Sequence, residues 1–213
     1  MQDPNDHNLA AQVEDRALAA RCLTGDQRAM RELVERYEGV VLRVCLRMLR
    51  HRQDAEDIVQ ETFVRAIRSL GRWDPERRFQ PWLLAIAANR CRTALGRRRV
   101  APFDHQEMAD ELPARRDHRP AMRQLSEEVD LALAEIRDEY RQAFELFHKE
   151  ELAYAEIAEV LEVPLGTVKT WVHRARQEVA VQLRRRGVVE TVCESEVNHA
   201  MPTHRNTTAR VAG

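Results

Sequence analysis

Residues 153–179 have the sequence AYAEIAEVLEVPLGTVKTWVHRARQEV, and this stretch decides the fold of the C-terminal part of the chain. A short amphipathic helix over 153–161 is predicted by apolar side chains at the spacing i, i+3, i+4, i+7, which are Tyr154, Ile157, Ala158 and Leu161. Glu162-Val163-Pro164 ends that helix, and a second one begins at Leu165. Its apolar side consists of Val168, Val172, Ala175 and Val179. Two short helices joined by so tight a turn are typical of the helix-turn-helix, whose second helix enters the major groove.

The second helix carries polar side chains opposite its apolar stripe. A helical wheel places Lys169 and Arg176 beside this polar face, at the groove walls, and Trp171 nearer the core. Such side chains hydrogen-bond base edges and phosphates. The alternative is a helical hairpin whose polar face is only solvated. The candidate duplex-DNA contacts are Thr167, Lys169, Thr170, His173, Arg174, Arg176 and Gln177.

Another amphipathic helix is predicted after Asp54, a candidate N-cap. Its apolar stripe comprises Ala55, Ile58, Val59, Thr62, Phe63, Ala66 and Leu70. Facing outward, opposite the stripe, are Asp57, Gln60, Glu61 and Val64. A solvated acidic face is the simpler interpretation. A valine among the acids favours a docking surface for a protein.

A third helix, over about Gln80 to Leu95, runs into Arg97, Arg98 and Arg99. Basic residues at a helix end interact favourably with its dipole, but with Arg90 and Arg92 they exceed what capping requires and favour phosphate contact. The preceding loop, 72–78, mixes arginines with Trp73 and can hold an unpaired base and its backbone. From the residues alone, Trp73 is better explained as a core plug beneath the loop.

The 213 residues are 32% charged, yet the net charge is only −1. Acidic residues concentrate at 54–61 and arginines at 90–99 and 174–186, which indicates one basic protein partner and one polyanion. Few glycines and aromatics, with long stretches of Ala, Leu, Arg and Glu, predict an all-α fold. No apolar run is long enough for a membrane helix and the N-terminus is no signal peptide, so we expect a soluble, cytoplasmic protein without membrane insertion.

The pattern divides the chain into two small helical domains, at 15–99 and 125–186. The proline-containing segment 100–124 is predicted to be a flexible linker, and 187–213 a mostly disordered tail. Four dispersed cysteines without a C-x-x-C pair indicate reduced thiols. The tail residues Cys193, His199 and His204 fit no standard zinc spacing, so no metal is expected.

Three segments together resemble the extracytoplasmic-function (group IV) sigma factors of bacterial RNA polymerase, over roughly residues 15–186. DAEDIVQETF at 54–63 is similar to the family's region 2.2, and FQPWL at 79–83 with IAAN at 86–89 is similar to regions 2.3 and 2.4. GTVK at 166–169 with HRAR at 173–176 is similar to region 4.2. Three signatures in the right order are far more specific than any one.

The resemblance implies a σ2 helical bundle and a σ4 helix-turn-helix domain, which bind core RNA polymerase and promoter DNA. The 54–64 helix would dock on the β′ clamp helices, σ4 would dock on the β flap and read the −35 duplex, and region 2 would open the −10 element and capture a flipped base. Family members are often held by an anti-sigma factor. The polymerase-binding candidates are Asp54, Glu56, Asp57, Gln60, Glu61 and Val64. The −10 candidates are Arg72, Trp73, Arg77, Arg78, Trp82, Asn89, Arg90, Arg97, Arg98 and Arg99.

The sequence departs from the family pattern at three positions. Thr93 stands where an Asp is usual. Ala153 replaces the usual Ser before the helix-turn-helix, which removes a cap. Glu162 replaces the common turn Gly, so the turn is either strained or avoids positive φ.

Two other classes of function fit the sequence less well. A one-component transcriptional regulator would need a ligand-sensing domain, for which 15–99 offers only a charged helical unit. An enzyme would need a Gly-rich phosphate loop, a metal cluster or a nucleophile–base pattern. The sequence has none of these, so neither catalytic residues nor a cofactor are expected.

Overall fold

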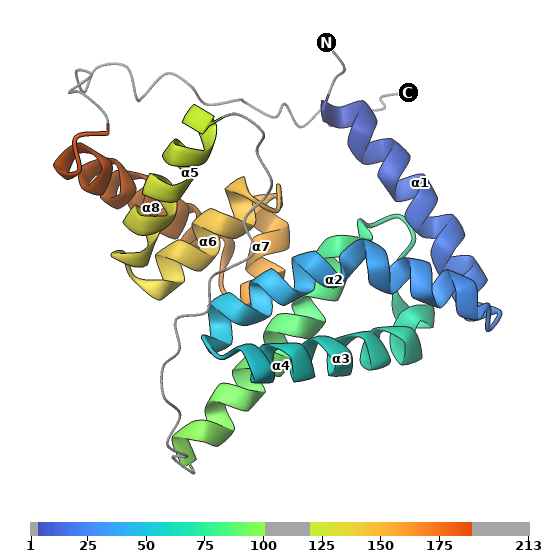
Figure 1. The fold of residues 1–213 in the computed structure, drawn as a ribbon. Helices are drawn as coiled ribbons and strands as arrows, with labels where there is room; N and C mark the ends of the chain where they lie inside the picture. The colour runs from blue at the N-terminus through green and yellow to red at the C-terminus, as the bar shows by residue number, and fades with distance from the viewer. Residues whose placement is uncertain (1–3, 101–119, 189–213) are drawn as a thin grey trace, which may run out of the picture.

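The structure, a computed structural model, describes residues 4–100 and 120–188. These residues form α-helices with one 3-10 turn and no strand, as predicted (Figure 1). An N-terminal unit contains α1 (Pro4–Leu23), α2 (Gln27–Leu49), α3 (Arg52–Ser69), η1 (Leu70–Arg72) and α4 (Phe79–Val100). A C-terminal unit contains α5 (Pro120–Ala134), α6 (Asp138–His148), α7 (Tyr154–Leu161) and α8 (Leu165–Arg185).

Helices α2, α3 and α4 pack against one another, and α1 lies along α2. The predicted stripe of α3 is buried from Ala55 to Leu70. The predicted cap is wrong: α3 begins at Arg52, and the ring of His51 accepts from the amide of Asp54 over 3.3 Å. Asp54 instead lies in the first turn, where a carboxylate complements the helix dipole.

Trp73 closes the core beneath the loop that precedes α4. Its side chain is only 6% exposed, and its ring meets Phe79 edge-on with 5.2 Å between centroids. Phe79 is fully buried and contacts Tyr37 and Trp82 as well. The interpretation of Trp73 as a core plug is therefore confirmed.

Helices α7 and α8 form the predicted helix-turn-helix, with α8 beginning at Leu165 as expected. The three-residue turn starts at Glu162, which adopts the left-handed conformation with φ 55°. Of the two possibilities for this turn the strained one holds, because a non-glycine residue at positive φ costs energy. At the other end, Ala153 provides no side-chain cap, but Glu156 accepts from its amide over 2.7 Å.

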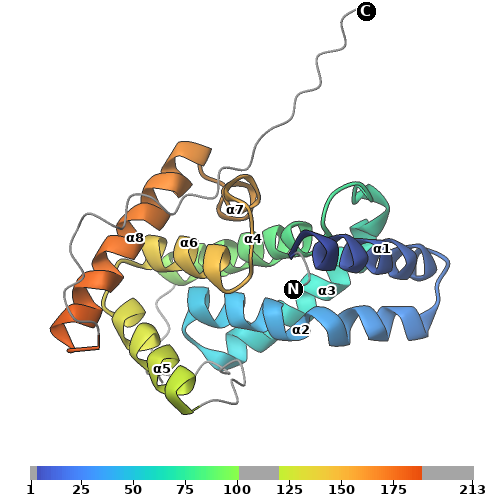
Figure 2. The same ribbon diagram turned by 90° about the horizontal axis from the view of Figure 1, so that it is seen from above.

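The two units pack against each other. Helix α7 lies on α4, and both views show the C-terminal unit beside the N-terminal one (Figures 1 and 2). One cluster of buried apolar residues continues from α2 and α4 into α6, α7 and α8. The predicted linker between the units falls largely outside the described residues, as does most of the tail.

None of the described helices is long and apolar enough to cross a membrane. No group of His, Cys, Asp or Glu in the described ranges could hold a metal ion. Cys193, His199 and His204 lie outside those ranges.

Candidate nucleic-acid and polymerase interfaces

The polar face of α8 is open to solvent. The apolar stripe from Val168 to Val179 is buried, which anchors the helix and turns the opposite side outward. Thr167 is half-buried in the first turn. Exposed on the outer side are Lys169, Thr170, His173, Arg174 and Gln177. A row of donors and acceptors on an exposed helix suits a major groove.

Arg174 is held by a residue that the sequence analysis did not single out. Its Nη1 donates to the hydroxyl of Tyr140 on α6 over 3.0 Å. The Tyr140 ring is buried in the core of the C-terminal unit, so its hydroxyl is a fixed point. The two residues are 34 positions apart, and no local pattern in the sequence could have paired them.

Arg176 lies at the edge of this face and is half-buried. Its Nε donates to Nε2 of His148 over 3.2 Å, and its guanidinium lies 5.0 Å from the centroid of the Phe147 ring. Burial lowers the pKa of His148, and the positive charge of Arg176 lowers that pKa further. A neutral His148 keeps the acceptor that orients Arg176.

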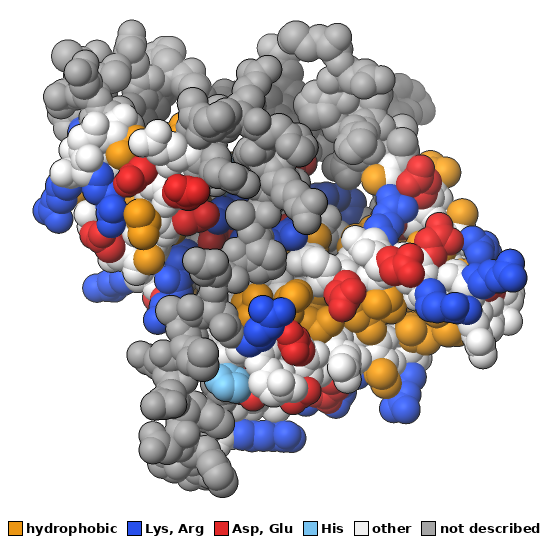
Figure 3. Space-filling view, in the orientation of Figure 1, with side chains coloured by type: hydrophobic (Ala, Val, Ile, Leu, Met, Phe, Trp, Pro, Cys, Tyr) orange, Lys and Arg blue, Asp and Glu red, His pale blue; other side chains and the backbone are white. Residues whose placement is uncertain are grey.

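The outer face of α3 is mixed in charge. Asp57, Gln60 and Val64 are exposed, whereas Asp54 and Glu56 are partly covered. Figure 3 shows acidic and basic side chains interspersed over α2 and α3, with a band of hydrophobic side chains along them. Glu61 differs from its neighbours, because it accepts from Arg65 on its own helix and from Arg90 on α4 at 2.9 Å. Burial raises the pKa of Glu61, but the hydrogen bonds from these arginines outweigh it and lower the pKa.

The −10 candidates lie in different surroundings. Arg77, Arg78, Asn89 and Arg90 all contact acidic side chains of this chain. Arg72 and Arg97 are exposed, Trp73 is buried, and Trp82 is half-buried against Phe79. Arg98 and Arg99 belong to the end of α4, and their side chains lie outside the described part of the structure. Arg92, which the sequence indicates as a phosphate contact, pairs with Glu162 at 2.9 Å.

An exposed row of polar side chains above a buried stripe on the second helix defines a DNA-binding protein of the helix-turn-helix class. The profile of sigma-70 region 2 matches residues 33–100, and that of sigma-70 region 4 matches residues 126–179. The chain is 32% identical over 171 residues to the ECF RNA polymerase sigma factor SigW of Bacillus subtilis, covering 75% of this chain and 91% of that protein. It belongs to the extracytoplasmic-function RNA polymerase sigma factors.

Other proteins agree with this assignment. The ECF RNA polymerase sigma-E factor of Haemophilus influenzae is 32% identical over 185 residues, covering 80% of this chain and 96% of that protein. The solved structure of CnrH in complex with the cytosolic domain of CnrY is similar, with a TM-score of 0.54 and 30% identity over 80% of this chain and 97% of that chain. The sigma factor RpoE from Bartonella quintana, solved with the anti-sigma factor NepR, shares the fold with a TM-score of 0.59 and 19% identity, over 72% of this chain and 96% of that chain.

Proposed function

We propose that this sigma factor recognises promoters through three surfaces. Helix α8 reads the −35 duplex through Thr170, His173 and Arg174, while the loop 72–78 and α4 hold the melted −10 strand. Helix α3 docks on the β′ clamp helices of core polymerase, and the C-terminal unit docks on the β flap. The observation that carries the proposal is the exposed polar face of α8 above a fully buried stripe.

Within this proposal Trp73 has a supporting role. Since its ring is packed against Phe79, it supports the loop from below and does not stack on a base in this conformation. Contact with the strand then falls to Arg72, Arg77 and Arg78, whose guanidinium groups form charge-assisted hydrogen bonds with phosphates.

Anti-sigma control is a further part of the proposal. Two similar solved structures contain a bound partner protein. In the structure from Bartonella quintana, that partner is named as the anti-sigma factor NepR. A soluble, cytoplasmic and non-catalytic protein fits this role, in which the chain acts only by binding.

Run-off transcription with purified core polymerase on a promoter library tests the proposal. We expect transcripts from a subset of promoters that share −35 and −10 sequences, and none from core polymerase alone. Binding of a promoter by the protein without any stimulation of core polymerase would instead support a one-component regulator. The hollow between the units has a volume of about 10 Å³, which holds at most one water and no small-molecule ligand.

A further inference from the structure

Three of the residues proposed to hold the −10 strand, Arg77, Arg78 and Asn89, are paired with acidic side chains of the C-terminal unit. Arg77 contacts both carboxylate oxygens of Glu159 at 2.6 Å, and Arg78 contacts Glu156 at 3.0 Å. Asn89 donates to Glu162 over 3.1 Å, and Arg92 pairs with the same carboxylate at 2.9 Å. Glu156 and Glu159 belong to α7, and Glu162 is its C-cap.

These three glutamates form a row with the chemistry of a nucleic-acid backbone. They are spaced three residues apart, which places successive carboxylates about 4.5 Å apart along the axis of α7. Guanidinium and amide donors bind carboxylates and phosphates in the same way. The N–H donors that Arg77 and Arg78 give to Glu159 and Glu156 are not available to a phosphate at the same time.

We propose that α7 occupies the −10 face of the N-terminal unit as an acidic substitute for DNA. In this arrangement the protein is closed, and the −10 strand binds only after α7 leaves. The inference rests on the proposed −10 role of the loop 72–78 and α4. It adds a binding partner for that face, namely the first helix of the protein's own helix-turn-helix.

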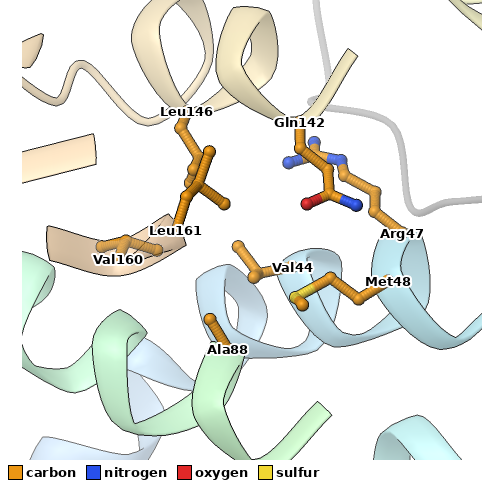
Figure 4. Close-up of a pocket in the computed structure, with 8 residues that line it drawn as sticks. All are labelled: Val44, Arg47, Met48, Ala88, Gln142, Leu146, Val160 and Leu161. Atoms are coloured by element: carbon orange, nitrogen blue, oxygen red, sulfur yellow. The ribbon is translucent and has the colours of Figure 1, made fainter. Parts of the chain in front are cut away.

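The rest of the interface combines apolar contacts with ion pairs. Below the ion pairs, Val44, Met48 and Ala88 face Leu146, Val160 and Leu161 across a small hollow (Figure 4). Charged pairs lie beside this apolar contact: buried Arg47 is 2.9 Å from buried Glu145, and half-buried Arg43 is 3.0 Å from buried Glu150. Buried ion pairs contribute little net stability because both charges lose water. An interface of this polarity resembles those between domains that move.

Closure covers one DNA-binding face and leaves the other open. Thr170, His173 and Arg174 on α8 stay exposed while α7 lies on α4. The closed protein is therefore expected to keep its affinity for −35 duplex and to lack affinity for single strands.

The test removes the three charges with Glu156→Gln, Glu159→Gln and Glu162→Gln in the full chain. Glutamine still accepts the capping hydrogen bond from Ala153. The matched control is Glu38→Gln, Glu127→Gln and Glu139→Gln, three exposed glutamates outside these ion pairs, with the same change in net charge. Binding of a fluorescent random-sequence single-stranded 15-mer is measured by anisotropy, and the radius of gyration by X-ray scattering.

We expect the first variant to expand and to bind the single strand about tenfold more tightly, as when a state populated at about one in ten becomes dominant. The control is expected to stay compact, with affinity within about twofold of wild type. A variant that remains compact, or one that expands without a gain in affinity beyond that of the control, overturns the proposal. Circular dichroism checks folding. If the triple variant unfolds, the single variant Glu159→Gln, at an exposed position, must still bind the single strand more tightly than wild type, by a smaller factor.

Promoter opening with core polymerase separates this inference from the proposed function. If Arg77→Ala with Arg78→Ala opens promoters normally, the −10 face itself is misassigned. If those variants fail while the triple glutamine variant behaves like the control, only the covering role of α7 is wrong.

Discussion

At the scale of single residues, Arg174 and Lys169 separate sequence reading from general DNA affinity. Arg174 projects from the outer side of α8 with its guanidinium anchored to Tyr140, whereas Lys169 is exposed nearer the helix start. A bidentate arginine–guanine contact discriminates between bases by about 1–3 kcal/mol, and a lysine–phosphate contact strengthens binding to any sequence.

Arg174→Ala is therefore expected to flatten base preference at one or two −35 positions. Lys169→Ala should weaken all promoters alike and lower the salt dependence of binding by about one unit of slope. Binding across single-base −35 variants at two salt concentrations measures both effects. Equal weakening of every variant by Arg174→Ala would show that Arg174 contacts phosphate.

His148 gives the stability of the C-terminal unit a pH dependence. Burial and the charge of Arg176 lower its pKa below 6.5, so the unfolded chain binds the proton more tightly than the folded protein does. The stability that a neutral His148 provides is complete above pH 6.5 and is lost as the pH falls through the lowered folded pKa. The free energy of unfolding, measured with urea, should fall between pH 8 and pH 5. In the His148→Gln variant this fall should be smaller. His173→Gln, on the free face of α8, is the control. The same pH dependence of the free energy of unfolding in wild type and His148→Gln would contradict the assignment to His148.

At the scale of elements, α3 carries an exposed acidic residue and a paired one on neighbouring turns. Asp57 is exposed, whereas Glu61 is engaged by Arg90 of α4. Asp57→Lys is expected to reduce co-purification with core polymerase at least tenfold, a loss of about 1.4 kcal/mol, without unfolding the protein. Glu38→Lys, the same change on the exposed side of α2, is the control. Normal polymerase binding by Asp57→Lys would remove α3 as the docking helix.

The sequence predicted where these helices lie, but not every helix end or long-range contact. Apolar spacing located α3, α7 and α8, and α8 begins at the expected Leu165, because each of these helices buries one continuous stripe. The start of α3 was misplaced because a histidine ring at His51 supplies the cap that an aspartate usually provides. Glu156 and Glu159 were simply polar positions of α7. Their contacts with Arg77 and Arg78, in the loop before α4, join positions about 80 residues apart, which no local pattern encodes.

At the scale of the whole molecule, the closed form is too short for a promoter. Elements at −35 and −10 are about 25 base pairs apart, or about 85 Å along the helix axis. A compact body of the described size has a radius of gyration of about 15 Å and is about 40 Å across. The segment 101–119, which joins the units, can span at most about 65 Å when fully extended. The units can thus bind both elements at once only after they separate.

The accessibility of Arg47 measures this separation. Its side chain is only 5% exposed, because it lies between Glu145 and Glu150 of the other unit. Dicarbonyl reagents modify accessible arginines, and mass spectrometry locates the modified side chains. In the free protein Arg47 should resist modification, and on adding core polymerase with promoter DNA it should react several-fold faster. Arg31, exposed elsewhere on α2, is the internal control and should react equally in both states. Continued protection of Arg47 in the transcribing complex would mean that the two units stay packed together, contrary to the span that the promoter requires.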